Sequence, residues 1–279
     1  MTIGKVLRGV YLGLLYLFIL APIIVVVASS FTRTNYIVFP PKGFTVRWYG
    51  ELVQNHPEFL ASLGVSIAVG LGTALGATAL GTLAALALER YPVPGRRALQ
   101  ELFGSPLVIP SVVLGVALLQ WYSALGIATS ILSLIIGHFI IAFPYVVRLV
   151  TAKLIDFRES HVERAAANLG ATPWQVFWKI TLPMIRSGII AGAVFAFVTS
   201  FDDLTVALFV VSTDVQTLPV RLFNYMQYNY DPVVTAISSL MVLLSVVMMV
   251  VMERAMGIGQ VFGVSGQQAG KRGKQRVYE

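Results

Sequence analysis

Residues 160–187 read SHVERAAANLGATPWQVFWKITLPMIRS and belong to a polar interruption, residues 148–187, between long apolar runs. The interruption carries six of the chain's twenty lysines and arginines. Ser160 and Glu163 have the spacing of a capping box, in which the serine hydroxyl and the carboxylate each accept from the other residue's backbone amide. This spacing predicts a short helix over residues 160–169.

Glycine and proline delimit that helix and a second one. Gly170 suits the left-handed C′ position at which the first helix would end. Thr172 and Pro173 follow as an N-cap and a proline at the first helical position. Pro183 is expected to close the second helix. A compact helix-turn-helix held at a membrane surface is suited to docking another protein.

The composition is that of a polytopic membrane protein. Hydrophobic residues make up 57% of the chain and charged residues 12%, with a mean hydropathy of +0.79. A soluble domain carries about 25% charged residues. The absence of cysteine excludes disulfides and thiolate metal sites, and the three histidines lack metal-ligand spacing. No phosphate-binding G-x-x-x-x-G-K-[ST] loop or nucleophile constellation is present, so we predict neither an enzyme nor a cofactor site in this chain.

Six apolar segments are long enough for helices to cross a hydrocarbon core of about 30 Å. Pro106 and Pro110 predict an irregular or kinked start to the third of them. With both termini in the cytoplasm, sixteen of the twenty lysines and arginines lie on the inner side, as the positive-inside rule requires. The basic excess therefore reflects topology and not nucleic-acid binding. The predicted spans are 10–30, 60–88, 102–125, 127–147, 188–210 and 232–252.

These spans define the expected organisation of an all-α protein. Residues 1–59 form an N-terminal helix with an external loop, residues 60–253 form the transmembrane bundle, and residues 254–279 form a disordered cytoplasmic tail. The serine- and glycine-rich face of the second span, which includes Gly72 and Gly76, predicts close helix packing.

Two aspartates and one histidine fall within the predicted spans. Asp202 and Asp203 are the only charges between Gly188 and Val211. One interpretation is that one or both line a path that favours a cationic solute. The other, which is compatible with it, is that Ser200 or Asp202 caps a new helix after a break. His138 has no acidic partner in its own predicted helix, which favours a hydrogen-bonded packing role over a proton-carrying or ligand-binding one.

The polar interruption resembles a known motif. ERAAANLG at 163–170, followed by ITLP at 180–183, is similar to the EAA loop of binding-protein-dependent ABC importer permeases. The family pattern is Glu-Ala-Ala, three residues, Gly, nine residues, then Ile-x-Leu-Pro. Arg164 stands where the family has glutamate, and Glu163 lies one residue earlier. The residues in register are Ala165, Ala166, Gly170, Ile180, Leu182 and Pro183.

The resemblance extends over most of the chain. FPPKGFT at 39–45 with Trp48-Tyr49, and SFDD at 200–203 with Phe209, resemble the PotC-type permeases of spermidine/putrescine importers. The resemblance implies the type I (MetI-like) permease fold, the bacterial inner membrane and a polyamine as solute. Related permeases for aminoethylphosphonate, opines or ferric iron share the same frame.

The family also implies partners and roles. The 160–169 helix would dock on a dimer of ATPase subunits, which bind ATP and Mg. A second permease and a periplasmic solute-binding protein would complete the importer within the lipid bilayer. The residues expected to couple to the ATPase are Glu163, Arg164, Ala165, Ala166, Gly170 and Pro183, and those expected to line the solute path are Asp202 and Asp203.

Two other classes of function compete with this one. An ion-coupled secondary transporter would use Asp202, Asp203 or His138 as its coupling group, but it leaves the 160–183 motif unexplained. A membrane-embedded enzyme requires a catalytic constellation that the sequence lacks.

Overall fold

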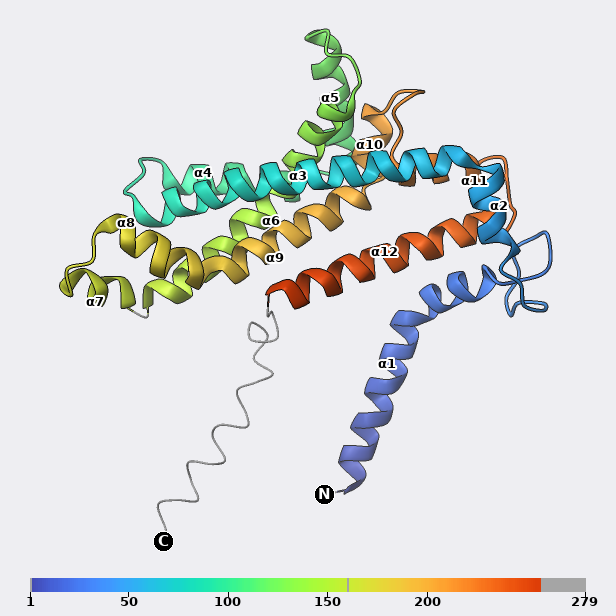
Figure 1. Cartoon of the computed structure of the whole chain (residues 1–279), viewed down its shortest axis with the longest axis horizontal. Coiled ribbons are helices and arrows are strands. Elements are labelled where there is room, and N and C mark those ends of the chain that lie inside the picture. The colour runs from blue at the N-terminus through green and yellow to red at the C-terminus, as the bar shows by residue number, and fades with distance from the viewer. Residues whose placement is uncertain (1, 160, 257–279) are drawn as a thin grey trace. The chain divides into compact units, whose positions relative to one another are not determined.

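The computed structural model describes residues 2–159 and 161–256, and this part of the chain consists of helices and their connections with no strand (Figure 1). The tail predicted to be disordered lies, from residue 257 onward, outside the described residues. The elements are α1 (Thr2–Ser29), α2 (Arg47–Asn55), α3 (Pro57–Arg90), α4 (Arg96–Gly104), the 3₁₀ turn η1 (Ser105–Leu107), α5 (Ser111–Ala124), α6 (Ile131–Glu159), α7 (Val162–Asn168), α8 (Pro173–Val176), the π turn η2 (Phe177–Thr181), α9 (Leu182–Phe201), α10 (Thr205–Val210), α11 (Leu218–Met226) and α12 (Val233–Met256).

The helices confirm an all-α membrane protein. Within the described residues, five helices are long and apolar enough to span a membrane, or six if a bent pair counts as one span. That pair, Arg96–Leu107 and Ser111–Ala124, is bent by 100°. The third span is therefore not one straight helix over 102–125. Pro110 has extended backbone, with ψ at 130°, and restricts the residue before it, so the helix stops and restarts in a new direction.

The polar interruption 148–187 is largely helical. α6 continues to Glu159, past the predicted end of its span at 147, and a helical stretch runs from Pro173 to Phe201. Polarity marks where a helix leaves the membrane, whereas the helix itself ends only where its local hydrogen bonds end. The predicted span 188–210 is instead interrupted at residues 202–204, between α9 and α10.

The described chain divides into two compact units. The first comprises Met1–Gly64 and Thr217–Val247, and the second comprises Val65–Gln216 and the chain from Met248. Helix α3 contributes its first turns to the first unit and its remainder to the second.

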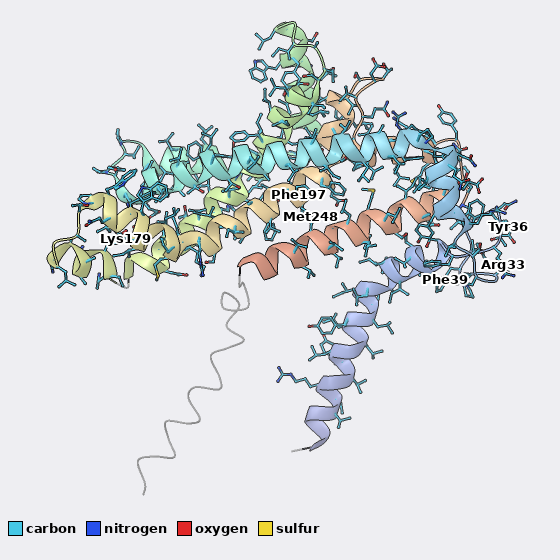
Figure 2. The ribbon with its side chains drawn as sticks, viewed as in Figure 1. Arg33, Tyr36, Phe39, Lys179, Phe197 and Met248 are labelled. Atoms are coloured by element: carbon cyan, nitrogen blue, oxygen red, sulfur yellow. The ribbon has the colours of Figure 1, made fainter. Side chains whose placement is uncertain are left out.

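The first unit has its own buried core. Figure 2 labels Arg33, Tyr36 and Phe39 in the loop between α1 and α2. That loop is tied to α2, because the Trp48 indole N–H donates to the Thr32 carbonyl over 2.7 Å. The Tyr49 hydroxyl lies 2.8 Å from Ser239 Oγ on α12. The core residues are Trp48, Leu52, Phe59, Leu218, Val233, Ala236 and Ile237.

In the second unit, α6 and α9 run side by side (Figure 1). Their approach needs glycine, since a Cβ on Gly192 would lie 3.2 Å from the Cα atom of Val146. Phe197 of α9 (Figure 2) packs on α3 at Gly70, where a Cβ would lie 2.9 Å from its ring. A Cβ on Gly72 would likewise lie 2.5 Å from Ile135. The close packing predicted for the second span is thus present, and small residues permit it.

Candidate functional site

The short helix predicted after residue 160 is present as α7, with a different start. Its N-cap position is His161, which has a φ of +55° and no side-chain capping hydrogen bond. The predicted capping box needs Ser160, which lies outside the described residues. The Glu163 carboxylate takes partners from other elements.

Helix α7 ends at Asn168, and Gly170 is its C′ residue, as predicted. The Gly170 N–H donates to the Ala167 carbonyl over 3.0 Å, and the Ala171 N–H donates to the Ala166 carbonyl over 3.1 Å. These two bonds form a Schellman motif, which needs a left-handed C′ residue. Gly170 meets that need with a φ of +88°.

The second predicted helix also starts as expected. The Gln175 N–H donates to the Thr172 hydroxyl over 3.3 Å, and the Gln175 side chain accepts from the Thr172 N–H over 3.0 Å. This capping box, with Pro173 at the first helical position, orients the chain on its way back from α7.

Pro183 does not close this helix, contrary to the prediction. α8, η2 and α9 follow one another without a break, and Pro183 lies in the first turn of α9. The Leu182 N–H donates to the Phe177 carbonyl, five residues back, as in a π turn. A proline ring normally collides with the carbonyl four residues earlier, and the wider π turn accommodates it within a continuing helix.

Glu163 meets two partners from distant parts of the chain. Its Oε1 atom accepts from the guanidinium of Arg90, at the end of α3, and from the hydroxyl of Thr181, in η2. Arg90 also donates to the Thr181 hydroxyl over 2.7 Å. The three side chains form a closed polar cluster, which we call the Arg90 cluster. Nothing in the local sequence identifies Arg90 or Thr181 as members.

The opposite face of α7 is open to solvent. Arg164 and Ala165 are exposed, and Leu169, directly after the helix, keeps 89% of its surface. Ala166, three residues after Glu163, lies on the Glu163 side and is half-buried. Trp174, at the start of α8, is 71% exposed. Lys179 lies on η2, at the end of the second unit where α7 and α8 lie (Figure 2). Exposed apolar and cationic side chains thus share this end of the unit.

The two aspartates differ in their surroundings. Asp202 is exposed, whereas Asp203 is half-buried and its Oδ2 atom accepts from the Ala207 N–H over 2.9 Å. The carboxylate that satisfies the start of α10 is therefore that of Asp203, and neither Ser200 nor Asp202 has this role. Asp202 remains the carboxylate with solvent access at the break between α9 and α10.

His138 lies in a buried polar network. The side chain is fully buried, and its Nδ1 atom lies 2.8 Å from Ser200 Oγ, which in turn lies 3.3 Å from Thr73 Oγ1. Its Nε2 atom lies 3.6 Å from Asp203 Oδ2, beyond hydrogen-bond distance. An acidic neighbour does exist, but it comes from the break between α9 and α10 and not from the histidine's own helix. No group of three or more His, Asp or Glu side chains suited to a metal occurs among the described residues.

Comparison with known proteins places this arrangement in a family. Residues 77–256 match the family described as the binding-protein-dependent transport system inner membrane component. The chain belongs to this family. It is thus a permease subunit of an ABC importer, a multi-pass protein of the inner membrane that works with an ATPase and a solute-binding protein. Such permease subunits are not enzymes.

Individual permeases of the family align with most of the chain. The spermidine/putrescine transport system permease protein PotC of Escherichia coli (strain K12) is 31% identical over 248 residues, which cover 89% of this chain and 93% of PotC. The putrescine transport system permease protein PotI of the same strain is 34% identical over 240 residues, covering 84% of each.

A solved structure shares the fold. A chain of the inward-facing MetNI methionine ABC transporter superposes with a TM-score of 0.57 at 19% sequence identity, covering 76% of this chain and 98% of that chain. The MetI-like permease fold expected from the EAA-type loop is therefore confirmed.

Proposed function

We propose that this permease passes a polyamine, spermidine or putrescine, into the cell, with both of its termini in the cytoplasm. The observation that carries the proposal is the exposed carboxylate of Asp202 at the break between α9 and α10, with Asp203 beside it. An acidic pair creates a negative potential that favours a polycation. Relatives named for spermidine and putrescine support the same class of solute.

In this proposal, α7 is the coupling helix. Its exposed face, with Arg164, Ala165 and Leu169, would dock on a dimer of ATPase subunits that bind ATP and Mg. A second permease would complete the path, and a periplasmic binding protein would deliver the solute. Closure of the ATPase dimer would shift α7, and the spanning helices would rock between inward-open and outward-open states.

A second candidate function is an importer of the same class that carries another organic or chelated solute, such as aminoethylphosphonate, an opine or ferric iron. The observation in its favour is that Asp203 bonds within the chain, which leaves a single exposed carboxylate at the break. MetNI, which shares this fold, is a methionine transporter, so one fold serves different solutes.

Transport in membrane vesicles tests the proposal. Vesicles would contain this permease, its partner permease, the ATPase and the binding protein, and uptake of labelled putrescine and spermidine would be measured with ATP. A matched preparation would carry an ATPase that lacks its phosphate-binding lysine.

ATP-dependent uptake that disappears with the defective ATPase is the expected result. ATP hydrolysis stimulated by the loaded binding protein without polyamine uptake would favour the second candidate. Uptake that persists with the defective ATPase would overturn the importer mechanism and favour an ion-coupled transporter.

A further inference from the structure

We propose that Arg90 is a positioning residue that fastens the coupling helix to the bundle, and that Glu163 is its counter-ion within the subunit and not a contact to the ATPase. The inference deepens the proposed function and rests on the role of α7 as the coupling helix.

The Arg90 cluster joins three elements that the sequence keeps far apart. Arg90 is the last residue of α3, Glu163 is in the first turn of α7, and Thr181 closes the π turn η2. Arg90 and Glu163 are 73 residues apart, and Arg90 and Thr181 are 91 apart. Each side chain bonds to both of the others, so a movement of α7 acts directly on α3 and on the helix that contains η2.

The surroundings strengthen these bonds. Thr181 is fully buried, and the side chains of Arg90 and Glu163 are only 31% and 36% exposed. The Arg90 guanidinium also lies 5.9 Å from the centre of the Phe177 ring, within the range of a cation–π contact. A charge-assisted pair that is partly shielded from water is stronger than an ion pair at an open surface.

Helix α7 has little else to hold it. It is seven residues long, all within the described chain, and none of the seven is buried. A helix of this length is marginal without tertiary contacts. Within the described residues, the Arg90 cluster is therefore a polar attachment that holds α7 against the bundle.

The charges also distinguish Glu163 from Arg164. Glu163 faces Arg90 and Thr181, whereas Arg164 is exposed on the docking side. If Glu163 left Arg90 to pair with the ATPase, the Arg90 guanidinium and the buried Thr181 hydroxyl would each lose the carboxylate as a partner. Losing a hydrogen-bond partner is costly for partly buried polar groups. The carboxylate accordingly stays inside the subunit.

The inference is tested by two measurements on the same assembled complex. One is the distance between two spin labels, and the other is the amount of solute taken up per ATP hydrolysed. The chain has no cysteine, so cysteines introduced at Asn168, the last residue of α7, and at Tyr91, directly after α3, carry spin labels at two defined points. The variants are Arg90→Ala, Arg90→Lys and Glu163→Gln. The control is Arg97→Ala, because Arg97 is an exposed arginine of α4, near the same end of α3 in the sequence. Partner subunits would be free of cysteine.

Both quantities are measured for each variant. Arg90→Ala and Glu163→Gln should broaden the distribution of distances between the two labels, while the ATPase still co-purifies and hydrolyses ATP. Solute taken up per ATP should fall by at least about fivefold, as expected for coupled partners in contact. Arg90→Lys keeps the charge but cannot bond to two partners in the same way, so it should restore part of the coupling. Arg97→Ala should leave both the label distance and the coupling unchanged.

Exchanging the two charges distinguishes a role in positioning α7 from a general contribution to stability. Arg90→Glu combined with Glu163→Arg should give a narrower distribution of label distances and more uptake per ATP than either single change. Equal label distances in Arg90→Ala, Arg97→Ala and the unaltered chain would overturn the inference. Failure of the unaltered complex to couple ATP hydrolysis to uptake would overturn the proposed function instead, while the distance readout would still decide the role of Arg90.

Discussion

The Nδ1 atom of His138 on α6 lies 2.8 Å from the hydroxyl oxygen of Ser200 on α9, 62 residues further along the chain. Both side chains are buried, and Ser200 also reaches Thr73 on α3. Three helices of the second unit are thus joined by hydrogen bonds at one level, directly before α9 breaks at Asp202. In an apolar bundle such bonds specify which helix faces meet.

Ser200→Ala should destabilise the second unit by about 1 kcal/mol, because it removes a partner from His138 and from Thr73 at once. The midpoint of thermal unfolding in detergent measures the loss. Ser123→Ala, at an exposed serine of α5, is the control and should have no effect. Equal midpoints for the two variants would contradict a structural role for the network.

Gly170→Pro should uncouple ATP hydrolysis from uptake without preventing membrane insertion. Proline requires a φ near −65°, whereas Gly170 has +88°, and proline cannot donate to the Ala167 carbonyl. The measurement is uptake per ATP hydrolysed, together with the amount of permease in the membrane.

Alanine substitutions give a matched comparison for this turn. Gly170→Ala and Gly95→Ala both place a side chain at a positive φ in open space, at a cost of about 1 kcal/mol each. Only the first should reduce coupling, because Gly95 lies between α3 and α4. Normal coupling in both Gly170 variants would mean that α7 is not the coupling helix.

Substitutions of Asp202 and Asp203 should affect different properties, namely solute uptake for Asp202 and stability for Asp203. Asp202→Asn is expected to reduce uptake of a cationic solute while the complex still assembles, because it removes exposed negative charge at the break. Asp203→Asn keeps an oxygen that can accept from Ala207, whereas Asp203→Ala removes it and should cost about 1 kcal/mol of stability.

Uptake over a range of solute concentrations, alongside the yield of assembled complex, measures both effects. If Asp202→Asn transports normally and Asp203→Ala fails to assemble, the aspartates serve structure and not the solute.

Arg164→Glu should weaken binding of the ATPase, because the exposed guanidinium would pair with a carboxylate of the ATPase groove. Co-purification of the ATPase over a series of salt concentrations measures this, and the loss should be largest at low salt. Arg97→Glu, which reverses an exposed charge on α4, is the control. Identical losses for the two variants would show a general effect of net charge and no contact at Arg164.

The sequence by itself determined the features whose physical basis is local or compositional. The turn at Gly170 and the cap at Thr172 were predicted correctly, since their hydrogen bonds join residues at most five apart. Composition identified a helical membrane protein, and the EAA-like register identified the family. These signals need no knowledge of which helices pack together.

Only the tertiary structure decided which distant groups meet and where helices continue. The partners of Glu163 and His138 come from other helices, so no spacing rule could find them, and Asp203 took the capping role predicted for Ser200 or Asp202. The helix continues past Pro183 because a π turn makes room for the ring. Local hydrogen bonding forms each helix, but side-chain packing between helices determines these contacts and bends.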